Sequence, residues 1–229
     1  MKINDVDIEE LLNIKLMERS IQPPKPIVIK QSVPFLSGSY DFSKMGGEIF
    51  YEEREITCKF AIPTENTTLL HMVYSQLLDL TMTDIKLKIG FEDIPYYYFI
   101  GSVQNGPNFD EIAQFGTCTI QFMCYPFKIC EFEEGNDIWD TFNFELDIFQ
   151  NVEFDINGSK AITLYNNSSC GIDPIIQCTS TMTVIKGKQS YTFKAGTTQS
   201  WSLRLDKGIN NLTVKGIGKI KFLWHKGIL

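Results

Sequence analysis

Residues 27–62 read IVIKQSVPFLSGSYDFSKMGGEIFYEEREITCKFAI, and this stretch decides the fold that we expect. Apolar side chains occupy every second position from 56 to 62. Alternation with a period of two places one set of side chains on a buried face and the other towards solvent. The pair Gly46 and Gly47 supplies a hairpin turn into this strand, which we expect over residues 48–62. The stretch holds no nucleophile beside a base and no ligand cluster, so it predicts β-structure rather than catalysis.

The composition is that of a globular protein that favours β-structure. Of its 229 residues, 43% are hydrophobic and 21% are charged, and 17 Phe and 9 Tyr supply flat rings that pack well on pleated sheets. Acidic residues outnumber basic ones by 28 to 21, and the net charge of −7 argues against a nucleic-acid binder. No apolar run approaches the roughly 20 residues that span a bilayer. The start MKINDVDIEELL lacks the positive flank of a signal peptide, so we expect the chain to fold in a cytosol.

One helix stands out from the β pattern. The sequence TTLLHMVYSQLLDL predicts a helix over residues 67–80, capped by Asn66 or Thr67. Its apolar face is expected to consist of Leu69, Val73, Leu77 and Leu80. Strands are expected after it over residues 84–91, 95–103 and 112–124.

The composition shifts near residue 130, and this shift predicts two domains. An acidic stretch with Gly135 inside it is typical of an inter-domain connection. Beyond it, short strands with turn signals about every 8–12 residues predict a sandwich or barrel. We therefore expect an N-terminal β domain with one helix over residues 1–130, an acidic linker over 131–143 and a C-terminal β-sandwich over 144–229.

Three parts of this layout resemble the siphophage distal tail protein (Dit) family. The first is VPFLSGSYDFS with the following YEEREIT strand. The second is the helix ending in LLDL, which leads into a strand pair containing YYYFIGSV. The third is a strand closing on MCYPFKI, before a separate β domain that finishes GIGKIKFLWHKGIL. The resemblance spans the whole chain.

The resemblance implies a mainly β structural protein of the phage tail, without catalysis and without a cofactor. Its N-terminal domain is expected to be β-sandwich-like, with one helix and a β-hairpin, and its C-terminal domain a galectin-like β-sandwich. The N-terminal domain would build a homo-hexameric ring that joins the tail tube protein to a tail-tip or tail-associated protein. The ring would lie at the tail tip of the virion and be assembled in the host bacterial cytoplasm.

A six-fold ring must cover strand edges and apolar faces, which suggests where subunits meet. Strand 95–103 carries aromatic residues on both faces, with Tyr97 and Phe99 opposite Tyr96 and Tyr98. We expect Tyr97 and Phe99 to contact a neighbouring subunit or the tail tube, together with Ile29 in the extended run 27–33.

The alternative function is a carbohydrate-binding β-sandwich protein. Tyr191, Trp201 and Trp224 are the candidate sugar-stacking platform, although their alternating strand positions are more typical of core residues. A host-surface glycan is a conceivable ligand, but no residue pattern in the sequence indicates one.

Catalytic and metal-binding residues are not predicted. His71 and His225 have no carboxylate, Ser or Cys at motif spacing. Cys118, Cys124 and Cys130 are spaced by six, so neighbouring members of this set lie about 20 Å apart along a strand, which is too far to share a metal. We expect the six cysteines to be free, buried thiols.

One charged residue is expected inside the protein. Arg54 is in register with Ile56 and Cys58, so it should point towards the packed face of its strand. A buried guanidinium needs a carboxylate, and Asp41 or Glu48 is the predicted partner.

Overall fold

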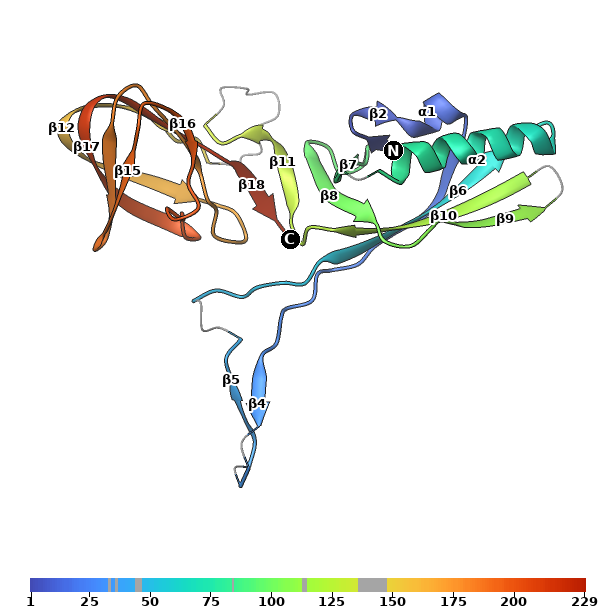
Figure 1. Ribbon diagram of the computed structural model, residues 1–229, viewed down its shortest axis with the longest axis horizontal. Helices are drawn as coiled ribbons and strands as arrows, with labels where there is room; N and C mark the ends of the chain where they lie inside the picture. The colour runs from blue at the N-terminus through green and yellow to red at the C-terminus, as the bar shows by residue number, and fades with distance from the viewer. Residues whose placement is uncertain (33, 36, 44–46, 84, 113–114, 136–147) are drawn as a thin grey trace. The chain divides into compact units, whose positions relative to one another are not determined.

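The computed structural model describes the chain except for residues 33, 36, 44–46, 84, 113–114 and 136–147. It divides into two compact units, Met1–Ile129 with Leu229, and Cys130–Ile228 (Figure 1). In the part of the chain that is described, no helix is long and apolar enough to cross a membrane. The predicted mainly β fold is confirmed, since strands build the core of each unit.

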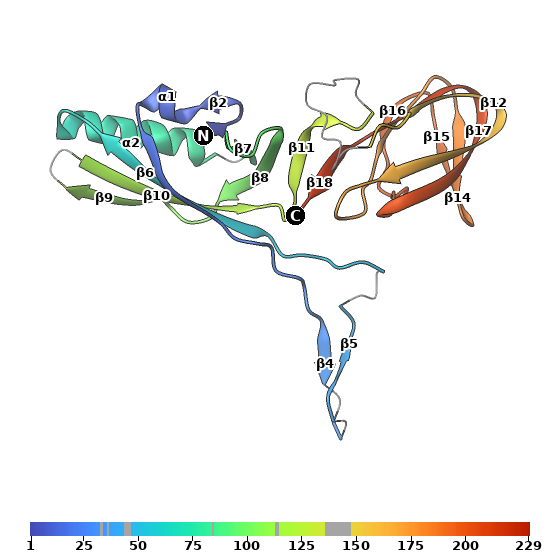
Figure 2. The ribbon, with the colours of Figure 1, turned by 180° about the vertical axis from the view of Figure 1, so that it is seen from behind.

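The first unit is built on one antiparallel sheet with the strand order β2-β1-β7-β8-β10-β6-β3, and β9 pairs with the end of β10. Its strands are β1 (Lys2–Ile3), β2 (Val6–Asp7), β3 (Lys15–Ile21), β6 (Arg54–Pro63), β7 (Leu87–Gly90), β8 (Tyr97–Val103), β9 (Asn108–Ile112) and β10 (Phe115–Cys124). Helices α1 (Ile8–Leu12) and α2 (Thr67–Thr81) belong to the same unit. Figures 1 and 2 show α2 lying along β6 and β10, against which it packs.

The alternation at the end of the opening stretch produces the central strand. Every second residue of β6 is buried, and the strand pairs with β10 over its full length. Strand β10 repeats the alternation, so the two strands present one continuous apolar face to α2. The strand begins at Arg54 rather than at residue 48, which shortens the predicted element at its start.

Helix α2 confirms the predicted element and its cap. The side chain of Asn66 accepts a hydrogen bond from the backbone N–H of Leu69 at 2.9 Å. The apolar face differs by one residue from the prediction, because Leu70 is fully buried beside Leu77 whereas Leu69 is exposed. Two adjacent leucines leave the choice between these faces open until the sheet beneath the helix is known.

A second, two-stranded sheet lies within the opening stretch. Strands β4 (Lys30–Ser32) and β5 (Ser39–Asp41) pair with each other, and β4 covers only part of the predicted run 27–33. The ladder continues towards β6 through Phe42, whose N–H donates to Ile29 O at 2.8 Å, and through the bridge between Pro26 and Tyr51.

The second unit is a six-stranded antiparallel arrangement with the order β15-β14-β17-β13-β16, in which β12 also pairs with β17. Its six strands are β12 (Glu153–Asn166), β13 (Ile175–Cys178), β14 (Met182–Lys186), β15 (Gln189–Phe193), β16 (Gly196–Gln199) and β17 (Gly208–Leu223). The last strand of the chain, β18 (His225–Ile228), pairs with β11 and is not part of this sheet. The long β12–β17 ladder runs from Glu153 opposite Lys221 to Asn166 opposite Gly208. Alternating residues of these strands fill one apolar core.

The predicted acidic linker is wrong at its start. Strand β11 (Lys128–Glu133) pairs with β18, so residues 131–133 belong to a sheet. The N–H of Glu134 then donates to Trp224 O at 2.8 Å. Acidic residues do not exclude a strand here, because charged side chains on an antiparallel strand can face water on one side. Residues 136–143 of the predicted linker lie outside the described residues.

Candidate functional site

Among the described residues, the titratable groups form no metal-binding cluster, and the cysteines are free thiols. Burial raises the pKa of the Cys58, Cys118 and Cys124 thiols to about 12. These thiols therefore remain protonated at neutral pH and pack as small apolar side chains.

The two histidines belong to different units, and each has its own contact. His71 is exposed on α2, with Nε2 3.5 Å from Glu111 Oε2. The Nδ1 atom of His225 lies 3.0 Å from the backbone oxygen of Cys130. Neither contact supplies a nucleophile with a base and an orienting group.

The structure corrects the predicted interface on β8. Phe99 is only 1% exposed and belongs to the core, where its ring lies 6.2 Å from that of Phe91. Tyr97 is on the same face and half-buried, with Lys128 Nζ 5.8 Å from its ring centroid. Phe99 therefore faces inwards, because β8 lies between β7 and β10 and one face of this sheet is covered by the core, whereas the half-buried Tyr97 keeps part of its surface exposed. Phe99 cannot contact a neighbouring subunit.

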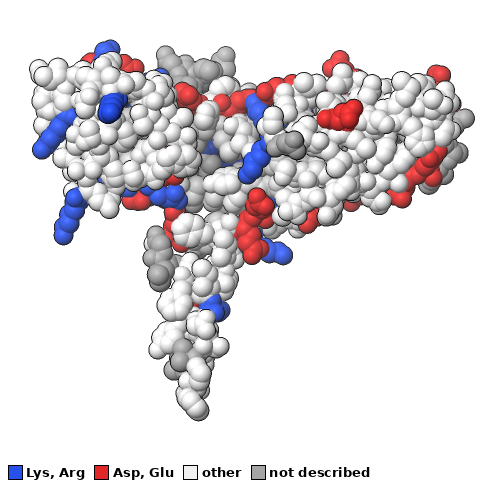
Figure 3. All heavy atoms as spheres, viewed as in Figure 1, with Lys and Arg blue, Asp and Glu red and all other residues white. Residues whose placement is uncertain are grey.

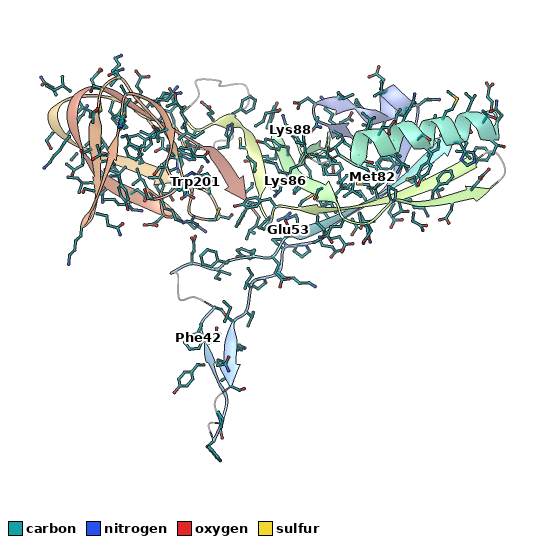
Figure 4. The ribbon with its side chains drawn as sticks, viewed as in Figure 1. Phe42, Glu53, Met82, Lys86, Lys88 and Trp201 are labelled. Carbon is teal, nitrogen blue, oxygen red and sulfur yellow. The ribbon has the colours of Figure 1, made fainter. Side chains whose placement is uncertain are left out.

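Ile29, the third predicted interface residue, lies on an exposed apolar segment. We call the described residues of 27–51 the arm. The exposed fraction of Ile29 is 55%, and Figure 4 labels Phe42, which is exposed on the same segment. Other large exposed apolar residues of the arm are Val28, Phe35, Tyr40, Ile49 and Phe50. None of the arm's described residues belongs to the core of the first unit.

The arm is an unusual surface for a protein in water. A two-stranded hairpin without a covering layer is marginally stable, and contiguous exposed apolar side chains mark interaction sites. Few charged side chains cover the arm on the face seen in Figure 3. In the sequence, Pro34 and Gly38 predict a turn inside an apolar run, which indicates a hairpin here. The pattern of apolar residues does not predict that both faces of this hairpin are exposed.

Arg54 is buried as predicted, but without the predicted partners. It is 5% exposed, and its guanidinium carbon lies 5.4 Å from the ring centroid of Phe99. The Nε and Nη2 atoms are buried and donate no hydrogen bond to any described residue. No ion pair joins Arg54 to Asp41 or Glu48 within the described residues; the Asp41 carboxylate accepts the backbone N–H of Ser43 at 2.9 Å.

The candidate sugar platform is not assembled. Trp224 is 4% exposed and lies in the core of the second unit, and Tyr191 is partly buried against that core. Trp201, labelled in Figure 4, is 81% exposed. The three rings therefore do not form one stacking surface, since one of them is inside the unit.

Comparisons with known proteins agree with the β architecture. The chain is similar over 97% of its length to 97% of the crystal structure of the SPP1 Dit protein, with a TM-score of 0.64 and 16% sequence identity. That structure is titled a paradigm of the hub adsorption apparatus in phages that infect Gram-positive bacteria. A comparison with curated proteins found no match.

The sequence itself carries a family signature across the first unit. Residues 6–124 match the model of the phage tail protein RIFT-related domain, which covers β2 to β10 and includes the arm. These residues make up more than half of the chain. The chain belongs to this family of phage tail proteins and is a structural component of the tail.

Proposed function

We propose that this protein is the subunit of a distal tail ring, in which six copies close through the first unit. The ring joins the tail tube protein to a tail-tip or tail-associated protein. It lies at the tail tip and is assembled in the host bacterial cytoplasm. Its role is structural and involves no catalysis. The single observation that carries this proposal is the arm, an apolar two-stranded segment of a phage tail protein with no core of its own.

A closed ring needs only one heterologous contact, repeated between identical subunits. The arm supplies one side of such a contact. Within the described residues, β4 and β5 pair only with each other, so each strand has one edge that no other described strand covers. A neighbouring subunit that covers the exposed apolar side chains removes both the apolar surface and the open edge from water.

The two units are suited to different roles. The first unit carries the arm and the family signature, and forms the ring. The second unit, a galectin-like sandwich with its own apolar core, is left for contacts outside the ring. We place the boundary between these roles near residue 130, where the two compact units divide.

The test is the mass of the purified protein and of an arm variant. We expect light scattering to give about six times the 26.2 kDa mass of one chain for the wild type. The double change Ile29→Asp with Phe42→Asp should give a folded single copy, because two charges cannot enter an apolar contact without a large desolvation cost. The matched control is Ile209→Asp with Ile217→Asp, two exposed residues on β17 of the second unit. Equal loss of assembly in both double variants contradicts the role of the arm.

A further inference from the structure

Arg54 occupies a position at which the sheet of the first unit would ordinarily hold an apolar residue. It is the first residue of β6, on the same face as Ile56 and Cys58, and it is registered opposite Cys124, the last residue of β10. The guanidinium therefore lies at the end of the β6–β10 pair, over the Phe99 ring. This end of the sheet adjoins the connection from the arm.

An unpaired guanidinium in such a place is costly, because a buried charge needs a partner that replaces its lost hydration. Burial lowers the pKa of Arg54, so the surroundings disfavour its charged form. The Nε and Nη2 donors nevertheless have no acceptor among the described residues. Arginine remains charged in proteins, and its planar fork of donors matches a carboxylate in a bidentate contact.

A second cation lies near this guanidinium. Lys128 is partly buried with its amine over the Tyr97 ring, and burial first, then the charge of Arg54, lowers its pKa. Neither cation has an ion pair with a described residue. Glu53, labelled in Figure 4, is exposed beside Arg54 in the sequence and does not satisfy the buried donors. Arg54 and Lys128 are therefore close enough for one charge to act on the other, and neither has a carboxylate partner among the described residues, so together they favour an anion.

We propose that Arg54 and Lys128 receive a carboxylate carried by a neighbouring copy of this chain. This inference rests on the proposed ring, in which every contact joins two surfaces of the same protein. The chain carries 28 acidic against 21 basic residues, so it supplies carboxylates in excess of its own cations. The Arg54–Lys128 receptor is also continuous along the chain with the arm, so a subunit that covers the arm lies within reach of it.

The experiment uses full-length protein and the variants Arg54→Met and Lys128→Met, which keep an unbranched, flexible side chain and remove its charge. Arg19→Met is the matched control, because Arg19 donates from Nη1 and Nη2 to both carboxylate oxygens of Asp93 at 2.6 Å in its own chain. The mass is measured by light scattering over a dilution series. The melting temperature is measured at concentrations at which the protein is a single copy.

We expect Arg54→Met to raise the dissociation constant of the ring contact by at least roughly 30-fold, which corresponds to removing one partner of a buried charge pair. Lys128→Met should raise it less, because Lys128 is more exposed. The melting temperature of the single copy should stay the same or rise with Arg54→Met, since the charge has no partner there. A fall of more than about 6 °C means that Arg54 is already paired within its own chain, and overturns the inference.

The outcomes separate this inference from the proposed function. Wild-type rings together with an Arg54→Met variant that assembles as well as Arg19→Met overturn the inference and leave the ring intact. A loss of assembly that Arg19→Met reproduces to the same extent also overturns it. A wild type that remains a single copy at every concentration contradicts both.

Discussion

Arg54 and Phe99 lie in contact across an intervening strand. Arg54 is on β6 and Phe99 on β8, with β10 between them, and the guanidinium carbon lies 5.4 Å from the ring centroid. The face of the aromatic ring gives the cation partial electrostatic compensation. The contact shows that one end of the apolar core holds a charged group. Through Arg54, the strand that follows the arm contacts a core residue of the first unit.

Phe99→Ala should destabilise the first unit strongly. Removing a fully buried phenylalanine loses its transfer free energy and leaves a cavity, which together cost about 3–5 kcal/mol of the free energy of unfolding. Denaturant unfolding, followed by far-UV circular dichroism, measures this loss in the free energy of unfolding. The control Met72→Ala removes an exposed side chain from α2 and should cost less than about 0.5 kcal/mol. A small effect of Phe99→Ala would mean that β8 is not packed as described.

Gly116→Ala should destabilise the contact between β10 and α2. A Cβ atom at this position would lie 2.6 Å from Leu70 Cδ1 and 2.8 Å from Phe109 Cε2, so these packed side chains must move. Overpacking of this kind costs about 1–3 kcal/mol. The control is Gly106→Ala, where an added Cβ meets no atom within 4 Å. Unfolding midpoints that are equal for the two variants contradict the packing of α2 on the sheet.

Asn66→Ala should weaken the start of α2 without affecting the sheet directly. The variant leaves the Leu69 N–H without its side-chain acceptor, which typically costs about 1 kcal/mol. Asn66→Asp keeps an acceptor and serves as the control. Hydrogen exchange of the first turn of α2 measures the effect. The assignment of the cap is wrong if alanine and aspartate give the same exchange rates.

The buried cysteines predict a fall in stability at high pH. Burial holds the thiol pKa of Cys58, Cys118 and Cys124 at about 12 in the folded protein, well above the ordinary value of 9.0. Between these values the unfolded chain has released these protons while the folded chain retains them. The unfolded state then binds fewer protons, so the free energy of unfolding decreases as the pH rises from about 9 towards 12.

This pH dependence is measured by comparing the wild type with a variant in which the three buried cysteines are alanine. The variant should lose less stability between pH 8 and pH 10 than the wild type does. A thiol reagent at pH 8 should modify the partly exposed Cys130 and Cys170 of the folded protein before the buried thiols. Equal reactivity of all six thiols contradicts the burial of the first unit's cysteines.

Trp201→Ala tests the alternative function. The side chain is exposed, so its removal should leave the free energy of unfolding and the mass of the assembly unchanged. Glycan binding by the wild type that this variant abolishes would establish a carbohydrate site on the second unit. Trp224→Phe is an unsuitable probe of such a site, because Trp224 belongs to the core.

The parts of the fold that follow from the sequence are those with strong periodicity. The alternation from Ile56 to Ile62 predicts β6 and its buried face, because a residue's face on a strand follows from its parity alone. The helix α2 follows from its capping residue and leucine spacing, although the adjacent leucines Leu69 and Leu70 do not fix its rotation. The inward direction of Arg54 also follows from parity.

The subunit interface expected on β8 and the sugar-stacking platform expected on the second unit could not be predicted in this way. Both depend on which face of a strand is covered by the rest of the protein. Phe99 and Tyr98 both fit an exposed or a buried face until β8 is placed between β7 and β10. Trp224 and Trp201 are likewise distinguished only by the core of the second unit. The missing partner of Arg54 is a tertiary property, since no local pattern reports where carboxylates from distant segments lie.

Electron microscopy of the purified wild-type protein tests the central claim most directly. Class averages viewed down the symmetry axis should show closed rings of six copies, and the same preparation of Ile29→Asp with Phe42→Asp should show none. Single copies at high concentration, open filaments or rings of another symmetry in the wild type would contradict the assignment of this chain as a six-fold tail ring subunit.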